Sequence, residues 1–268
     1  MEATRPEPEA AATILLEASR LSKSFRGLQA LVDYDLRLSA GAIHGVIGPN
    51  GAGKTTLFHL LSGFLPPTSG SISFEGRDIT GSHAFKVARL GIGRTFQNIR
   101  LFGELSVLDN VKVGLQRRSE RSLAGTLISN ASFRRGEREL EARAIELLEL
   151  FGLTRQRDRS ARNLPYGDQR RLEIARAVGS RPKLLLLDEP NAGMNPIETQ
   201  ELLGLIRRLR DEFGITIVLV AHDIPLVMNL CDRIQVLNYG RLIAEGDPAT
   251  VRANRDVIDA YLGQARHA

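Results

Sequence analysis

One stretch of nine residues combines a lysine, two hydroxyl side chains and repeated glycine in a way that suits phosphate binding. It reads Gly48, Pro49, Asn50, Gly51, Ala52, Gly53, Lys54, Thr55, Thr56. Glycine admits backbone conformations closed to other residues, so consecutive N–H groups of such a loop can converge on one anion. Lys54 is then in reach of nucleotide phosphates, Thr55 is in register for a Mg²⁺ ion, and Thr56 is expected to begin a helix. The stretch predicts a phosphate-binding loop.

The residues on either side of this loop favour that interpretation over a chance match in a glycine-rich turn. An apolar run of strand length, Ile43 to Ile47, precedes it, and Leu57, Leu60 and Leu61 recur at helical spacing after it. Strand, loop and helix therefore follow in the order that the motif requires.

Two acidic residues and a histidine follow buried strands elsewhere in the chain. Leu184 to Leu187 is wholly apolar, as in a parallel strand covered on both faces, and Asp188 and Glu189 come next. Asp188 is a candidate anchor for Mg²⁺, and Glu189 can polarise a water for attack on a γ-phosphate. His222 follows a second such strand, so it is expected at the same sheet edge. Standing alone, the acidic pair would more simply be polar residues that end a strand.

The order of patterns predicts an α/β fold with a phosphate-binding loop. Alternating residues from Ile14 to Leu38 indicate a small antiparallel sheet, and helical periodicity dominates between about Val107 and Asn163. Buried strands then return, and Arg233 to Glu245 has the pattern of a closing hairpin around Tyr239 and Gly240. We expect a loose tail at 1–12, one domain at 13–262 with a helical insertion at about 98–180, and a second tail at 263–268.

Composition excludes several classes of protein. The 268 residues carry 36 Lys and Arg against 31 Asp and Glu, an excess too small to indicate nucleic-acid binding. The single cysteine, Cys231, rules out an internal disulfide and is expected to be a small buried side chain. No apolar run approaches the roughly 18 residues that a membrane-spanning helix needs, so we expect a protein that stays inside the cell.

Taken together, these motifs resemble those of the ATP-binding-cassette ATPases. The matching pieces are Gly48 to Thr56, Gln97, the run Leu164, Pro165, Tyr166, Gly167, Asp168, then Leu184 to Glu189, and His222. The resemblance implies a P-loop nucleotide hydrolase of ABC type. It also implies a Walker A loop at Gly48 to Thr56, and a signature motif at Leu164 to Asp168 that completes a partner's ATP site.

The same resemblance assigns roles to single residues. It implies that Glu189, His222 and Gln97 are catalytic, and that Thr55, Gln97 and Asp188 hold Mg²⁺. It further implies that Phe25 is the aromatic platform for adenine. As lone residues, Phe25 would more often belong to a core and Gln97 to an ordinary surface.

Within that superfamily, the chain is most similar to the ATPase subunits of branched-chain amino acid importers. The similar pieces are Arg94 to Gln97 with Arg100 to Phe102, Tyr166 to Arg176, Ala192 to Pro196, and Val257 to Gly263. The resemblance implies a peripheral subunit on the cytoplasmic face of the inner membrane, with ATP as substrate. Its expected partners are two permeases, a second ATPase subunit and an extracytoplasmic binding protein. We expect the two ATPase subunits to form a heterodimer rather than a homodimer. An exporter ATPase and a nucleic-acid- or ribosome-associated cassette protein are the alternatives.

The chain departs from the general superfamily pattern at its signature motif. The usual order is Leu-Ser-Gly-Gly-Gln, whereas Pro165, Tyr166 and Asp168 stand here for the serine, the first glycine and the glutamine. Asn195 also replaces a common aspartate. Because proline offers neither a hydroxyl nor a backbone N–H, we expect the two ATP sites of an assembled transporter to be unequal.

Overall fold

The computed structural model describes residues 13–116 and 131–262. The expected tails at 1–12 and 263–268 lie outside these residues. The strands are β1 (Ile14–Phe25), β2 (Leu28–Ser39), β3 (Ile43–Ile47), β4 (Ser69–Phe74), β5 (Arg77–Asp78), β6 (Ile92–Arg94), β7 (Leu184–Asp188), β8 (Thr216–Val220), β9 (Arg233–Asn238) and β10 (Arg241–Gly246). The helices are α1 (Lys54–Leu61), α2 (Ala84–Leu90), α3 (Val107–Gln116), α5 (Ala131–Leu150), α6 (Tyr166–Gly179), α7 (Pro196–Asp211), α8 (Ile224–Leu230), α9 (Pro248–Ala253) and α10 (Arg255–Leu262).

A six-stranded sheet carries the residues that the motifs single out. Its order is β10-β9-β3-β8-β7-β6, with parallel pairing from β9 to β6 and an antiparallel β9–β10 hairpin at one edge. The carboxyl ends of β3, β7 and β8 therefore meet at one edge, where ligands bind in open α/β sheets. The predicted strands and the closing hairpin are confirmed.

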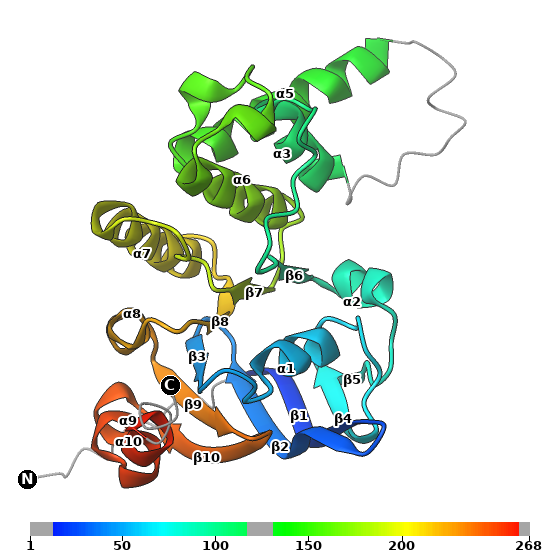
Figure 1. Cartoon of the computed structure of the whole chain (residues 1–268). Helices are drawn as coiled ribbons and strands as arrows, with labels where there is room; N and C mark the ends of the chain where they lie inside the picture. The colour runs from blue at the N-terminus through cyan, green and yellow to red at the C-terminus, as the bar shows by residue number, and fades with distance from the viewer. Residues whose placement is uncertain (1–12, 117–130, 263–268) are drawn as a thin grey trace, which may run out of the picture.

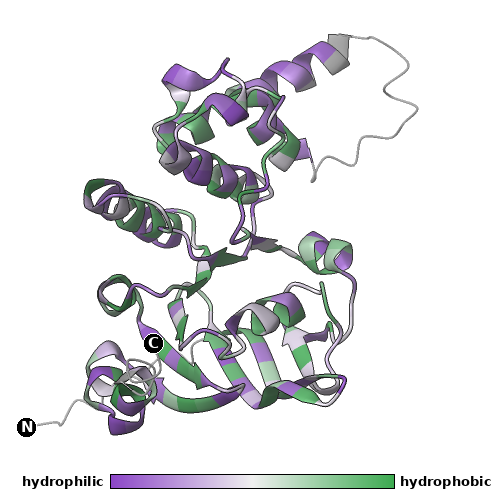
Figure 2. Cartoon of the chain, viewed as in Figure 1, coloured by the Kyte–Doolittle hydropathy of each residue, from purple (hydrophilic) through white to green (hydrophobic). Residues whose placement is uncertain are grey.

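Both faces of this sheet are buried, as its wholly apolar strands predict. Leu185 and Leu187 of β7 pack in one core with apolar residues of α6, α7 and α8, while Leu184 and Leu186 pack on the other face with α1 and the second sheet. Figure 2 shows the same pattern as hydrophobic strands at the centre of the molecule. Successive side chains of a strand point to opposite faces, so one leucine run serves two cores.

The second sheet has four strands in the order β2-β1-β4-β5, all antiparallel. Its buried residues share a core with α1, the helix that follows the phosphate loop. Figure 1 shows this sheet beside α1, on the side of the molecule away from α3, α5 and α6. The antiparallel sheet predicted from the alternating N-terminal pattern is confirmed.

Helices α3, α5 and α6 form a group at one end of the molecule (Figure 1). Their buried stripe includes Val111 of α3, Ala144 and Leu148 of α5, and Leu172 of α6. The chain leaves the six-stranded sheet after β6 and re-enters it at β7, so the group is joined to the sheet by these two neighbouring strands. No helix among the described residues has the length and apolar character needed to span a membrane.

The phosphate loop connects β3 directly to α1. Helix α1 begins at Lys54, two residues before the predicted start at Thr56, because Gly53 already occupies the N-cap position in the left-handed region at φ 105°. A Cβ atom on Gly53 would lie 2.5 Å from the Ala30 carbonyl oxygen, so glycine is required there for space as well as conformation.

Candidate functional site: a phosphate-loop cavity at the sheet edge

A cavity of about 540 Å³ lies where the phosphate loop meets the carboxyl ends of β7 and β8. Among the predicted site residues, Asn50, Gly51, Ala52, Gly53, Lys54, Thr55, Thr56, Gln97, Glu189 and His222 line it, together with Leu28, Gln29, Ala30 and Tyr239. Residues from six separate parts of the sequence thus face one space. The volume is in the usual range for a small-molecule site.

Lys54 is the buried cation of this cavity. Its side-chain nitrogen donates to the backbone carbonyls of Gly48 (2.6 Å) and Pro49 (2.9 Å), so the lysine closes the loop on itself. Burial lowers the pKa of Lys54, and the nearby carboxylates of Glu189 and Asp188 oppose that shift. Gly48 and Pro49 therefore lie behind the lining and hold Lys54.

Glu189 and His222 lie side by side at the sheet edge. Glu189 Oε1 is 2.8 Å from His222 Nε2, within hydrogen-bonding distance. The backbone of Glu189 has φ 47°, in the left-handed region, and its N–H donates to the Val220 carbonyl of β8 at 2.8 Å. Such a conformation costs of order 1–3 kcal/mol and is concentrated at functional sites. The strained turn directs Glu189 into the cavity, whereas its neighbour Asp188 stays in the strand.

Asp188 is more buried than the sequence suggests. It is 2% exposed, and its Oδ2 accepts from Arg94 Nη2 at 3.2 Å. Its backbone N–H donates to the Thr95 hydroxyl at 3.2 Å. Burial raises the pKa of Asp188, and the Arg94 guanidinium opposes that rise. The side chain of Asp188 is thus held by Arg94, the last residue of β6, and its backbone by Thr95, the residue after that strand.

The donor set fits a Mg²⁺ ion bound with a nucleotide. Thr55 and Gln97 line the cavity with a hydroxyl and an amide oxygen, and Asp188 supplies a carboxylate behind them. No group of three His, Cys, Asp or Glu side chains able to hold a metal occurs among the described residues. Mg²⁺ is typically bound through only one or two carboxylates and completes its shell with substrate phosphates and water. These three donors therefore suit a Mg²⁺ ion that binds together with the nucleotide phosphates.

Phe25 and the signature residues lie outside the cavity lining. Phe25 ends β1 and is half-exposed beneath the Lys23 ammonium, 5.2 Å from its ring centre, while its strand partner Leu28 does line the cavity. The role of Phe25 as an adenine platform remains a prediction. The signature residues Leu164, Pro165, Tyr166, Gly167 and Asp168 lie at the start of α6, with Pro165 as its N-cap.

A buried ion pair that the sequence did not predict joins α6 to the residues around Gln97. Arg170 and Glu173 are at most 1% exposed and meet at 2.8 Å. Arg170 donates to the carbonyls of Phe96 (2.6 Å) and Gln97 (2.8 Å), and Glu173 accepts from the backbone of Phe96 and Arg100. The segment that carries Gln97 is thus attached to the signature helix.

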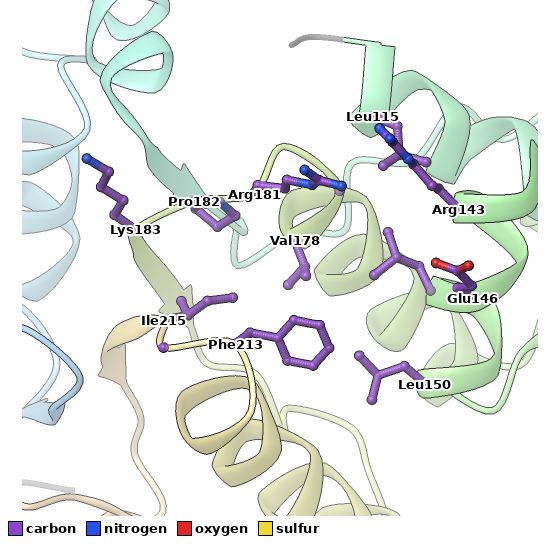
Figure 3. Close-up of a pocket in the computed structure, with 13 residues that line it drawn as sticks. Leu115, Arg143, Glu146, Leu150, Val178, Arg181, Pro182, Lys183, Phe213 and Ile215 are labelled. Carbon is purple, nitrogen blue, oxygen red and sulfur yellow. The ribbon is translucent and has the colours of Figure 1, made fainter. Parts of the chain in front are cut away.

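A second cavity lies where the helical group faces the residues that lead into β7 and β8. Its volume is about 560 Å³, and it lies between α5, the end of α6 and the residues that precede β8. Figure 3 shows Phe213, Ile215, Val178 and Leu150 pointing into this space, with Arg143 and Arg181 at its margin. None of the predicted site residues lines it.

The fold and the cavity define a P-loop ATPase of the ATP-binding-cassette type. Solved structures of this type are similar over nearly the whole chain. One is a nucleotide-free ATP-binding cassette from an ABC transporter, 30% identical with TM-score 0.81, covering 92% of this chain and 98% of that chain. Another is the ADP conformation of an ATP-binding cassette of an ABC transporter, 30% identical with TM-score 0.80, covering 93% and 99%.

The chain belongs to the ABC transporter family. The family model for ABC transporters matches residues 31–192, and a model described as branched-chain amino acid ATP-binding cassette transporter matches residues 241–267. The high-affinity branched-chain amino acid transport ATP-binding proteins BraF of Pseudomonas aeruginosa and LivG of Escherichia coli are each 46% identical, over 94% of this chain and 98% of theirs. The lipopolysaccharide export system ATP-binding protein LptB of Escherichia coli is 36% identical, over 93% of this chain and 97% of its own length.

Proposed function

We propose that this chain is the ATP-hydrolysing subunit of an importer for branched-chain or other hydrophobic amino acids. The observation that carries the catalytic part is the convergence of Lys54, Thr55, Gln97, Glu189 and His222 on one cavity. The substrate class comes from the 46% identity to branched-chain amino acid transport proteins and from the C-terminal match. The lower identity to an export protein makes export the weaker alternative.

Phosphate binding in this proposal depends on the loop and on Lys54. The loop N–H groups and the N-terminus of α1 receive the phosphates, because both present unpaired donors and a positive field. Lys54 transfers its hydrogen bonds from the Gly48 and Pro49 carbonyls to phosphate oxygens, so its ammonium is already in place before ATP binds. A bound Mg²⁺, held by Thr55, Gln97 and Asp188, would neutralise charge on those oxygens.

Water activation is assigned to Glu189. Its carboxylate accepts the proton of the attacking water, and the positive φ of its backbone holds the side chain toward the cavity. His222, 2.8 Å away, orients that carboxylate and contacts the γ-phosphate. Gln97 lines the same cavity and links it to the helical group through its backbone contact with Arg170.

The transport partner in this proposal docks beside the Gln97 segment. A groove of about 590 Å³ there is lined by residues of β6, α3 and α6 and by residues on both sides of Gln97, including Phe96, Arg100 and Phe102. Phe102 is 50% exposed, with the Arg176 guanidinium 5.3 Å from its ring centre. An exposed aromatic ring among cations suits a loop helix of a permease. The chain would then sit on the cytoplasmic face of the membrane with two permeases, a second ATPase subunit and a binding protein.

The proposal is tested by transport and hydrolysis measured on the same preparation. Glu189→Gln should keep nucleotide binding and lower ATP hydrolysis in the assembled complex by about two orders of magnitude. Lys54→Ala should instead weaken nucleotide binding. Glu212→Gln, on the surface at the end of α7, is the matched control. Uptake of radiolabelled leucine into proteoliposomes that depends on ATP and on Glu189 supports import; outward movement of a lipid substrate supports export.

A further inference from the structure

Arg94 occupies a position between two functional surfaces of the molecule. It is the last residue of β6, and its side chain is 5% exposed. One guanidinium nitrogen, Nη2, donates to Asp188 Oδ2 at 3.2 Å, and the other, Nη1, donates to the Ser62 hydroxyl at 2.9 Å. Because Ser62 is the C-cap residue of α1, Arg94 connects the acidic end of β7 to the end of the phosphate-loop helix.

Three aromatic rings hold the Arg94 guanidinium in place. Its central carbon lies 5.6 Å from the ring centres of Phe58 and Phe64, and 5.0 Å from that of Phe96. The rings of Phe64 and Phe96 also contact each other edge to face at 5.5 Å. Each such cation–aromatic contact is individually modest, but together they fix a planar group that is already hydrogen-bonded at both ends. Arg94 therefore has little freedom to leave Asp188.

The same side chain faces the groove described above. Arg94 and Phe96 both line it, and the Arg100 guanidinium also lies 4.1 Å from the centre of the Phe96 ring. A partner that presses on Phe96 or Arg100 would shift the ring on which the Arg94 guanidinium rests. Since Arg94 is hydrogen-bonded to Asp188, Arg94 alone would pass this shift on to the acidic residue at the nucleotide cavity.

We propose that Arg94 is a positioning residue that fixes the Asp188 carboxylate for Mg²⁺ and transmits occupation of the groove to it. The Asp188 part requires only this chain. The groove part rests on the proposed function, because it requires the groove to be where the permease docks.

The first test measures Mg²⁺ dependence of nucleotide binding in the isolated full chain. ATP affinity is determined with Mg²⁺ and with EDTA for the wild type, Arg94→Met and Arg94→Lys. We expect the increase in ATP affinity that Mg²⁺ produces to be about tenfold smaller in Arg94→Met than in the wild type. The ATP affinity of this variant in EDTA should stay within twofold of the wild type, because the loop and Lys54 are untouched. Arg94→Lys keeps the charge but cannot bond Asp188 and Ser62 with one planar group, so it should lose part of the gain.

Arg208→Met is the matched control for this test. Arg208 is an exposed arginine of α7 that pairs with Glu212 and lines neither the groove nor the nucleotide cavity, so its Mg²⁺ response should be that of the wild type. Circular dichroism and the unfolding midpoint show whether each variant is folded; should Arg94→Met be unfolded, Arg94→Lys decides. The proposal is overturned if a folded Arg94 variant shows the same Mg²⁺-dependent increase in ATP affinity as the wild type.

The second test uses the assembled transporter. For each protein, the rate of ATP hydrolysis with substrate-loaded binding protein is divided by the rate without it. This ratio should be at least fivefold smaller in Arg94→Lys than in the wild type, because the variant no longer links the groove to Asp188. Normal stimulation with an altered Mg²⁺ response would overturn the groove part of the proposal. Absence of any amino acid transport by the wild-type complex would instead contradict the proposed function, and the first test would still decide the role of Arg94 at Asp188.

Discussion

Replacing Glu173 by glutamine should destabilise the protein far more than the change of one oxygen for nitrogen suggests. Glu173 accepts three hydrogen bonds: one from Arg170 at 2.8 Å, and two from the backbone N–H groups of Phe96 (3.4 Å) and Arg100 (3.1 Å). Glutamine has a single acceptor oxygen and adds an NH₂ donor. Whichever way the amide is turned, its NH₂ group faces another donor, and Arg170 loses its counter-ion.

The size of the effect follows from the burial of the pair. Removing one partner of a buried ion pair typically costs about 3–5 kcal/mol, because the other charge stays buried without compensation. Arg170 keeps its bonds to the carbonyls of Phe96 and Gln97, so the lower end of that range applies. We therefore expect Glu173→Gln to lower the free energy of unfolding by about 3 kcal/mol.

Urea unfolding followed by far-ultraviolet circular dichroism measures this loss. The chain contains no tryptophan, so dichroism is a better signal than intrinsic tryptophan fluorescence. Glu212→Gln is the matched control, because it removes the same charge from an exposed i,i+4 pair with Arg208 and should leave the midpoint within error. A loss below about 1 kcal/mol for Glu173→Gln, at an unchanged slope, would refute the reasoning that Arg170 depends on Glu173.

Three further predictions follow from single positions. Phe102→Ala should lower transport more than basal hydrolysis without changing the unfolding midpoint, since Phe102 is 50% exposed; a parallel fall of both activities with stability would contradict a docking role. Pro165→Ser should raise turnover of the assembled complex by up to roughly tenfold, because serine adds a donor for the partner's ATP and is a better N-cap; unchanged turnover would exclude unequal sites of this origin. Burial lowers the pKa of His44 from its ordinary 6.5 to about 4, so as the pH falls the unfolded chain is protonated before the folded chain. Neutral His44 therefore contributes about 3 kcal/mol to the free energy of unfolding above pH 6.5, and this contribution is lost as the pH falls toward 4. Urea unfolding at pH 7 and pH 5 should show a smaller decrease for His44→Gln than for the wild type, and equal decreases would contradict this assignment.

The chemistry of the site could be predicted from sequence because its parts are local. The phosphate loop, the leucine strand before Asp188 and the strand before His222 each occupy fewer than ten residues, and parallel pairing then brings their ends together. Helix α1 begins two residues before the start that its sequence pattern predicts, because Gly53 in its left-handed conformation caps the helix.

The supporting contacts could not be predicted because they join distant positions. Arg94 and Asp188 are 94 residues apart, and Arg170 is 74 residues from Phe96, so no periodicity links them. The available signals were a lone arginine at the end of a buried strand, and an Arg and a Glu at i,i+3 in a helix that is otherwise apolar on that face. The positive φ of Glu189 has no signal in its residue type.

The attachment of α6 to the Gln97 segment has a thermodynamic consequence for a pair of such subunits. In the proposed dimer, Gln97 serves the chain's own ATP, while the start of α6 serves the ATP held by the partner. Arg170 and Glu173 bond both pieces into one body, so a ligand that displaces Gln97 in one site also displaces the helix presented to the other. The two binding events then share a coupling free energy, and linkage makes it reciprocal. Cooperativity between two nucleotides would thus originate inside each subunit, at a buried ion pair that touches neither of them.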